Sequence, residues 1–196
     1  FEGTTYTCFS FTEGPLADTI SKMIKLPVCI ENDTRSMTYA EYVKGCCKGL
    51  KDVVFVNVCW GLGIGIIVNG ELYYGKSGYS GEFGHNPAYN NNIICHCGKI
   101  GCVETEASGR ALKRKLTEAI QAGKQSILSD KVINRKEDLT LIDILEAIGK
   151  EDVLSLATLQ QVADELGKQL AGVINVFNPE MLVIGGEMSV TGNYLT

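Results

Sequence analysis

The sequence has few prolines, no cluster of basic residues and no long apolar run, and each of these absences excludes a class of protein. Only 4 of the 196 residues are proline and 21% are charged, which argues against a disordered, collagen-like or coiled-coil chain. The formal net charge is −5, so these residues themselves are unsuited to binding nucleic acid. No apolar run approaches the roughly 20 residues that a membrane helix needs, and the N-terminus lacks the pattern of a signal peptide. We therefore expect a soluble, cytoplasmic protein with no membrane partner.

Apolar residues are nevertheless abundant, and their spacing predicts an α/β protein in which strands feed helices. They make up 45% of the chain, and a protein of this length needs no disulfides to fold. Short apolar runs, and a hairpin signal at Asn69-Gly70, predict strands at 28–30, 53–59, 66–68, 71–74 and 181–184. Helical periodicity and capping signals predict helices over 16–24, from Asn32 or Asp33 to about Leu50, over 112–120 and 140–148, and along a stretch ending at Asn178-Pro179.

Eight cysteines are more than a cytoplasmic protein usually carries, and three of them crowd into eight residues. The other five lie among apolar neighbours and are interpreted as small buried hydrophobes: Cys8, Cys29, Cys46, Cys47 and Cys59. The cluster of Cys95, Cys97 and Cys102, with His85 or His96 as a fourth ligand, suits a closed tetrahedral Zn²⁺ site. Such a site would stabilise the long loop between 77 and 102. The alternative is a set of reduced, unligated thiols.

The polar and glycine-rich segments each allow two interpretations. The alternating glycines of 61–65 can cradle a phosphate with backbone N–H groups, or form a tight turn between paired strands. Asp33 follows a strand at a helix start, where it can accept a proton from a substrate hydroxyl or simply cap the helix. Glu82 and Glu104 bracket the cysteine loop, and each would ordinarily be a solvated charge.

Two segments around the cysteines resemble the signature of the ROK family of repressors, open reading frames and sugar kinases. The family pattern is G-E-x-G-H followed by C-x-C-G-x-x-G-C-x-E, and residues 81–85 and 95–104 match it at every defined position. Ile30-Glu31-Asn32-Asp33 is similar to the family's Asn-Asp motif. The segment 61–75 is similar to its second glycine-rich phosphate turn, and 182–186 to its late strand-and-glycine element. The resemblance thus covers nearly the whole chain.

The resemblance implies an actin-like ATPase (ribonuclease H-like) fold, with a sugar between two lobes and a zinc-stapled loop. Residues 1–50 would be the end of the first lobe, and 51–196 most of the second lobe, both truncated relative to the family. Matching positions imply structural zinc on His85, Cys95, Cys97 and Cys102. They imply sugar contacts from Asn32, Asp33, Glu82, His85 and Glu104, with zinc on one ring nitrogen of His85 and its other edge towards the sugar. If a nucleotide binds, the resemblance places it at Gly61, Gly63, Gly65, Gly185 and Gly186.

Three departures from the family's kinases favour a regulator. The chain begins after their D-x-G-x-T phosphate loop, Trp60 replaces a small hydroxyl residue, and Thr34-Arg35 replaces Ala-Asn after Asp33. An indole offers one donor and much bulk where a hydroxyl would meet a phosphate. We therefore expect the effector-binding region of a ROK-type transcriptional regulator, similar to the N-acetylglucosamine repressor type, that senses a hexose or amino sugar.

The alternative is an ATP-dependent sugar kinase of the glucokinase or N-acetylhexosamine kinase type. It would use Mg-ATP, with Asp33 as the general base. A third possibility is a zinc-stapled structural domain without a ligand. In that case the match of four polar residues to the family's sugar contacts would be a coincidence: Asn32, Asp33, Glu82 and Glu104. A regulator of this family would contact DNA only through a helix-turn-helix upstream of this chain, and the resemblance also implies a homo-oligomer.

Overall fold

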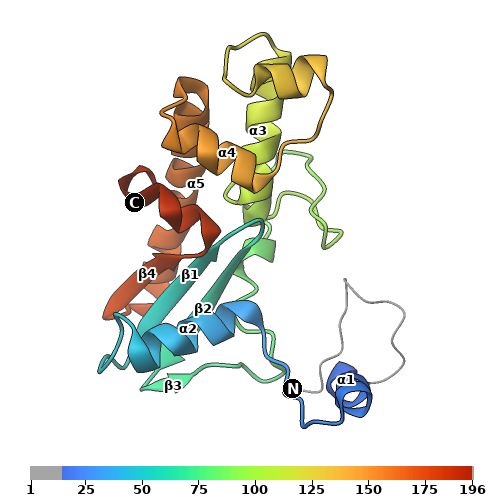
Figure 1. Ribbon diagram of the computed structural model, residues 1–196. Helices are drawn as coiled ribbons and strands as arrows, with labels where there is room; N and C mark the ends of the chain where they lie inside the picture. The colour runs from blue at the N-terminus through green and yellow to red at the C-terminus, as the bar shows by residue number, and fades with distance from the viewer. Residues whose placement is uncertain (1–14, 196) are drawn as a thin grey trace.

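A mixed four-stranded sheet lies at the centre of the structure, with helices on both faces (Figure 1). The computed structural model describes residues 15–195. The helices are α1 (Leu16–Ile24), α2 (Asp33–Lys44), α3 (Gly109–Gln121), α4 (Leu141–Gly149) and α5 (Val153–Phe177). The strands are β1 (Val53–Val58), β2 (Leu62–Val68), β3 (Glu71–Leu72) and β4 (Met181–Gly185). Shorter 3₁₀ or π turns lie at Phe83–His85, Val103–Thr105, Asp130–Asn134 and Glu187–Tyr194.

The order of strands in the sheet is β3-β2-β1-β4. Strand β1 pairs antiparallel with β2 and parallel with β4, which places Asn57 beside Gly63 on one side and Gly185 on the other. All six residues of β1 are buried, as its nearly continuous apolar run predicts. The hairpin at Asn69-Gly70 is confirmed, with φ angles of 52° and 83° at its two central residues.

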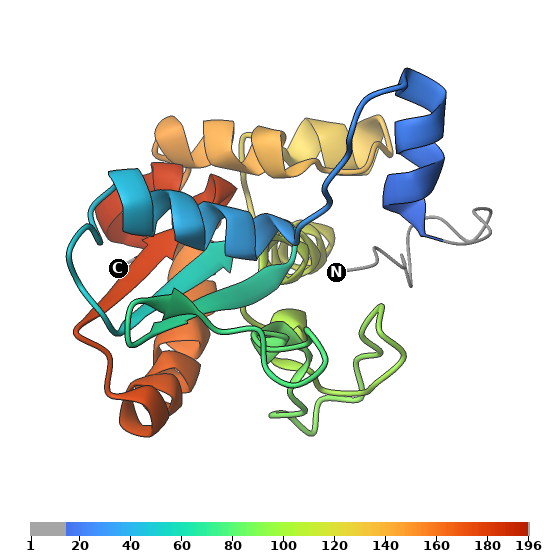
Figure 2. The same ribbon diagram turned by 90° about the horizontal axis from the view of Figure 1, so that it is seen from below.

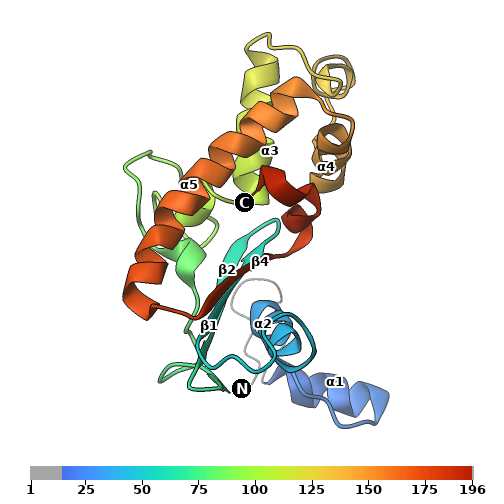
Figure 3. The same cartoon turned by 90° about the vertical axis from the view of Figure 1, so that its left-hand side faces the viewer.

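The sheet separates a large core from a small one, with α3, α4 and α5 on one side and α2 on the other (Figure 3). On one face, alternate residues of β1 and β2 such as Val56 and Ile64 join the apolar sides of α3, α4 and α5. On the other face, Val53 and Ile67 form a smaller cluster with Cys47, close to α2. Because both faces are covered, the chain has the α/β architecture that the sequence predicts.

The predicted helix signals are confirmed for most elements. Helix α4 begins with the complete capping box of Thr140 and Asp143. Helix α3 is followed by Gly123 with a φ of 90°, and α5 ends at Asn178 in the left-handed conformation. Among residues 15–195, no helix is long and apolar enough to cross a membrane.

Four predictions about elements are wrong in whole or in part. The strand expected over 71–74 ends at Leu72. Residues 28–30 have no regular secondary structure and pair with no strand in the described part of the chain, because an apolar run this short needs a neighbour to form a sheet. The helix expected to reach about Leu50 ends at Lys44, since Gly45 adopts extended angles. The strand at 181–184 exists but is only half-buried, because β4 lies at an edge of the sheet.

The interpretation of the scattered cysteines as buried hydrophobes is only partly right. Cys47 is buried and Cys59 is half-buried, but Cys29 and Cys46 are exposed. Cys29 lies on the unpaired segment before α2, and Cys46 follows the end of α2, where its N–H donates to the Glu41 carboxylate at 3.1 Å. Cys8 lies outside the described residues.

Candidate functional site

Glycines in β2 let helix α2 lie close to the sheet. A Cβ at Gly63 would come 2.9 Å from Thr34 Oγ1, and one at Gly65 would overlap the Thr38 side chain. Thr34 is also held by Asn57, whose Nδ2 donates to its hydroxyl at 3.0 Å. The N-terminal end of α2 therefore lies over the start of β2 (Figure 2). Close packing of α2 accounts for these two glycines without a phosphate.

The Asn-Asp motif occupies the first turn of α2. Asn32 is the N-cap, because its Oδ1 accepts from the Arg35 N–H at 3.0 Å. Asp33 is exposed, and its Oδ1 accepts from the Thr34 N–H at 2.7 Å. Within residues 15–195 the other carboxylate oxygen of Asp33 accepts no hydrogen bond, which leaves it available to a ligand.

Arg35 connects this motif to the loop that carries Glu82. Its guanidinium is buried, pairs with the Glu31 carboxylate at 2.8 Å and donates to the Gly78 carbonyl at 2.9 Å. The Tyr74 hydroxyl donates to the other Glu31 oxygen at 3.0 Å. Burial opposes ionisation of Glu31, but these donors together with the Asn32 N–H hold its pKa below the usual value. Arg35 therefore joins the start of α2 to the loop that precedes Glu82.

The G-E-x-G-H segment lies along the part of β2 that β3 does not pair with. The Ile64 N–H donates to the Gly81 carbonyl at 3.0 Å, and a Cβ at Gly81 or Gly84 would overlap a backbone oxygen of β2. This close approach explains both glycines of the motif. Glu82 remains half-exposed, as expected of a solvated charge, and its Oε2 lies 3.8 Å from His85 Nε2.

Glu104, in contrast, is not the solvated charge that the sequence suggests. It is only 4% exposed. Its Oε2 accepts from the Leu62 N–H at 3.0 Å, and its Oε1 lies 2.8 Å from His96 Nδ1. A Cβ at Gly61 would come 2.9 Å from the same carboxylate. Burial is tolerated because both oxygens are satisfied by donors.

The residues expected to contact a sugar thus surround the first three residues of β2. Asn32 and Asp33 directly precede Thr34, which contacts Gly63; the G-E-x-G-H segment carries Glu82 and His85, and Glu104 binds the Leu62 N–H. Within residues 15–195, no hydrogen bond joins the side chains of Asn32 or Asp33 to the other three. Asp33 and Glu82 are exposed and lie on separate elements, whereas Glu104 is buried.

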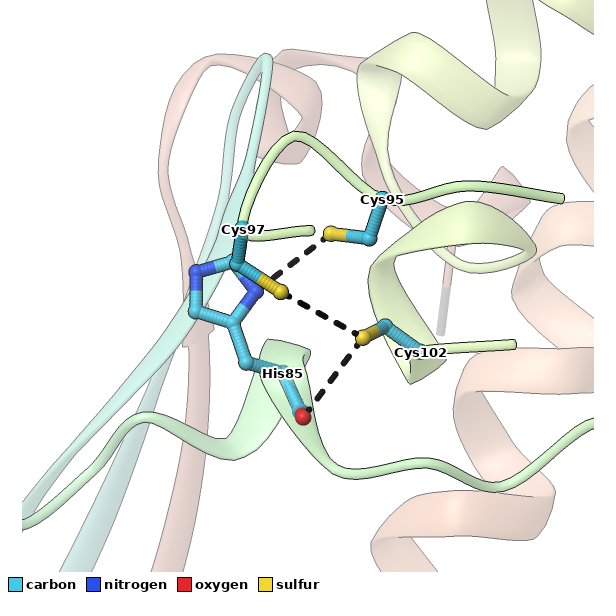
Figure 4. Close-up of side chains that lie close together, drawn as sticks. All are labelled: His85, Cys95, Cys97 and Cys102. Carbon is cyan, nitrogen blue, oxygen red and sulfur yellow. Dashed lines mark hydrogen bonds between the residues drawn. The ribbon is translucent and has the colours of Figure 1, made fainter. Parts of the chain in front are cut away.

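Three cysteines and one histidine form a compact cluster (Figure 4). One ligand atom from each of His85, Cys95, Cys97 and Cys102 lies within 4.8 Å of all the others. His85 Nδ1 is 3.6 Å from Cys95 Sγ, and Cys97 Sγ is 3.7 Å from Cys102 Sγ. Tetrahedral Zn²⁺ with ordinary bond lengths separates two sulfurs by about 3.8 Å and a sulfur from a nitrogen by about 3.6 Å. The cluster can therefore hold a metal ion.

The thiols of this cluster differ in acidity. Burial and the neighbouring thiols raise the pKa of Cys102 to about 12. Burial also raises the pKa of Cys95. At Cys97 burial acts in the same direction, but the Lys99 N–H and the neighbouring thiols lower the pKa below the usual value. Three thiolates packed this closely repel one another unless a cation is bound between them.

The structure assigns different neighbours to the two histidines. His85 presents Nδ1 to the cysteines and Nε2 to Glu82, the two-sided orientation that the resemblance implies. His96 Nδ1 lies 3.8 Å from Cys95 Sγ but much closer to the Glu104 carboxylate. Of the two, only His85 shares a four-membered cluster with all three cysteines.

Trp60 stands in the turn between β1 and β2 and faces α3. Its half-buried ring lies beneath Arg110 and Lys113, at 5.7 and 5.8 Å from the ring centre. The Trp60 carbonyl accepts from the Arg110 N–H at 3.1 Å, and the Cys59 carbonyl accepts from the Gly109 N–H at 2.8 Å. The turn and the start of α3 are thus joined by backbone hydrogen bonds and by the indole.

Sequence reasoning missed several polar anchors of the site. Tyr89 fastens the cysteine loop to α5, with its hydroxyl 2.9 Å from the Glu165 carboxylate, and burial with this acceptor raises the pKa of Tyr89 to about 12. Arg35 appears in the sequence only as a departure from the kinases. Asn57 had a visible signal, because it is a polar residue inside an otherwise apolar strand.

Two curated relatives resemble this chain along most of its length. The glucokinase of Halalkalibacterium halodurans is 35% identical over 92% of this chain and 55% of its own length. The N-acetylglucosamine repressor of Escherichia coli is 33% identical over 89% of this chain and 41% of its own length. The chain therefore spans about half the length of the curated relatives it matches.

Solved structures show the same fold in both functional classes. A ROK family glucokinase from Streptomyces griseus, in complex with glucose and AMPPNP, has a TM-score of 0.80 and 31% identity over 93% of this chain and 59% of its own. A ROK family transcriptional regulator, a homologue of the Escherichia coli MLC protein, has a TM-score of 0.82 and 34% identity over 99% of this chain and 48% of its own. These neighbours confirm the α/β class and the actin-like sugar kinase fold. A model of the ROK family matches residues 6–196, and the chain belongs to the ROK family.

Proposed function

We propose that this chain is the sugar-binding part of a transcriptional regulator that responds to a hexose or an amino sugar. The observation that carries the proposal is the convergence of polar side chains on the start of β2. Asn32 and Asp33 from α2, Glu82 and His85 from the G-E-x-G-H segment, and Glu104 supply the carboxylate, amide and imidazole groups that bind sugar hydroxyls. The glucose complex of the similar glucokinase and the sugar named for the similar repressor support this ligand class.

We also propose that the metal of the cysteine cluster is structural zinc. The ligands are His85 Nδ1 and the sulfurs of Cys95, Cys97 and Cys102, a closed set that matches tetrahedral geometry. When bound, zinc supplies a cross-link within a loop that has little apolar packing of its own. It would also hold the His85 ring so that its Nε2 stays beside Glu82.

The choice of regulator over kinase rests on Trp60. Phosphoryl transfer depends on positioning and on stabilising charge around the transferring group. A bulky indole lies in the turn where the family's kinases carry a small hydroxyl residue, and it is held there by Arg110 and Lys113. In the kinase alternative, Asp33 would be the base, Mg-ATP the cofactor, and Gly61, Gly63, Gly65, Gly185 and Gly186 would lie near the nucleotide. At Gly63 and Gly65 the packing of α2 already fills that space.

Several parts of the proposal concern the whole protein. We propose a boundary between lobes at about residue 50, a DNA-binding helix-turn-helix upstream of this chain, a homo-oligomeric state and a cytoplasmic location. Sugar binding would then alter how the lobes are arranged and so the geometry of the DNA-binding module.

The test uses the full-length protein. Calorimetry with a panel of hexoses, xylose and N-acetylhexosamines should show binding of at least one sugar. An ATP-dependent phosphorylation assay with that sugar should show no turnover by the parent protein. The Trp60→Thr variant is assayed beside it as a reference. Binding of no sugar would overturn the sugar-binding proposal. Turnover at the roughly 1–100 s⁻¹ usual for kinases would overturn the regulator proposal and establish the kinase alternative.

A further inference from the structure

His96 lies between two of the clustered cysteines, yet its shortest contact is with a carboxylate outside the cluster. His96 Nδ1 is 2.8 Å from Glu104 Oε1 and 3.8 Å from Cys95 Sγ. The second oxygen of Glu104 accepts from the Leu62 N–H at 3.0 Å. The Glu104 side chain has three rotatable bonds, but both oxygens of its carboxylate are held, one by the backbone of β2 and one by His96.

We infer that His96 is a positioning residue that holds the Glu104 carboxylate in place for a sugar hydroxyl. This inference rests on the proposed function, because Glu104 is one of the proposed sugar contacts. Oε1 also lies 4.0 Å from Cys95 Sγ, but Oε2 keeps a second lone pair after its hydrogen bond from Leu62, so the carboxylate can accept from a ligand without rearranging. Fixing it beforehand removes the entropy cost of ordering it when the sugar binds.

The space beside this pair is suited to a ligand group. A pocket of about 260 Å³ is lined by Cys95, His96, Glu104 and Arg110, among others. Glu104 is the buried acceptor in it and Arg110 an exposed donor. The pocket thus offers both kinds of hydrogen-bonding group that a polyhydroxylated ligand uses, and of the proposed sugar contacts it is lined by Glu104 alone.

The same atoms permit one competing explanation, a second metal site. Ligand atoms of Cys95, His96 and Glu104 also lie within 4.8 Å of one another. However, two ligands on tetrahedral zinc would be separated by about 3.3 Å or more. The 2.8 Å between His96 Nδ1 and Glu104 Oε1 is the length of a charge-assisted hydrogen bond. The geometry therefore favours a direct hydrogen bond.

The test compares three variants of His96 in the full-length protein with the best-binding sugar. The contact is made through Nδ1, so His96→Asn, whose amide nitrogen reaches nearly the same position, should keep sugar affinity within about twofold. His96→Gln, whose amide nitrogen reaches the position of Nε2 instead, and His96→Ala should each weaken binding by roughly 3- to 10-fold, the effect of one lost hydrogen bond. A role in packing alone would not distinguish Asn from Gln.

Glu104→Ala provides the reference arm. It should weaken binding by roughly 10- to 100-fold, the effect of losing a hydrogen bond to a charged group, and His96→Ala should add nothing further in that background. Thermal unfolding identifies variants that have lost the fold, and zinc analysis identifies those that have lost the metal. We expect one zinc ion per chain in every variant.

Each outcome separates this inference from the proposed function. If the parent binds sugar and Glu104→Ala weakens it, but His96→Gln and His96→Ala bind as the parent does, the positioning role of His96 is wrong and the sugar site stands. If Glu104→Ala binds as the parent does, this inference and the Glu104 contact both fail. If zinc falls from two ions per chain to one in His96→Ala, the pair is a second metal site and the inference is overturned.

Discussion

Removing one ligand from the cysteine cluster should release the metal and loosen the loop that it closes. Cys102→Ser is the most informative change, because Cys102 is fully buried and its Sγ lies 3.7 Å from Cys97 Sγ. Serine is nearly isosteric but is a poor ligand for zinc, which in structural sites is bound by thiolate and imidazole. The substitution therefore tests the metal and leaves the packing almost unchanged.

The expected loss of stability follows from the length of chain that the metal closes. His85 and Cys102 are the first and last ligands, and a cross-link over the 18 residues between and including them contributes about 3 kcal/mol in chain-entropy terms. For a chain of this size, each kcal/mol lowers Tm by about 2–4 °C. We therefore expect Tm to fall by about 6–12 °C.

Three measurements on the full-length protein check this expectation. Elemental analysis of protein purified without added metal should give near-stoichiometric zinc in the parent and little in Cys102→Ser. Thermal unfolding should show the fall in Tm, and hydrogen exchange should increase over residues 77–104. Cys29→Ser is the matched control, because Cys29 is exposed and outside the cluster, and it should change none of these. A folded parent without metal, with freely titratable thiols, would refute the reasoning.

Two further changes test how the fold is held around the site. Although partial burial opposes ionisation, the Lys131 ammonium and the capping of α4 lower the pKa of Asp143 in the folded protein to about 2. The ionised carboxylate therefore stabilises the fold at pH values above its unfolded pKa near 3.8, and Asp143→Asn should lower the free energy of unfolding in urea by about 1–2 kcal/mol at pH 7. A cost that stays unchanged as the pH falls towards 2 would contradict this. In Gly65→Ala the new methyl group would overlap Thr38, which should lower the stability of the fold by about 1–3 kcal/mol. Gly167→Ala is the control inside α5: its methyl group meets nothing within 4 Å and should raise the stability by about 0.5–1 kcal/mol. Equal Tm values for the two variants would show that α2 does not lie so close to β2.

Local signals in the sequence were enough to predict most elements of the fold. The capping box at Thr140, the left-handed stop at Asn178 and the hairpin at Asn69-Gly70 each depend on a few neighbouring residues, because turns and caps are decided by local backbone geometry. The residues of the candidate metal site belong to the same category. Their spacing is short enough for one loop to bring them together.

Several of the predictions that failed depended on a distant partner. The run at 28–30 had the composition of a strand but finds no strand to pair with among residues 15–195. Burial of Cys29 and Cys46 was expected from their apolar neighbours in sequence, but both are exposed among the described residues. Burial is a property of packing, and adjacent residues do not determine it.

The environment of Glu104 shows the same division at the candidate site. The sequence identified Glu104 through a motif, and its ordinary state next to a polar loop would be a solvated charge. Only the tertiary structure decided that it is buried between the Leu62 N–H and His96, because those donors come from a strand 42 residues away and from the cysteine loop. Likewise, the glycines at 63 and 65 are visible in the sequence, but their reason is the close approach of α2, a contact between elements. Residue types and short spacings are fixed along the chain, whereas the partners of a buried charge or a close-packed glycine exist only once the chain has folded.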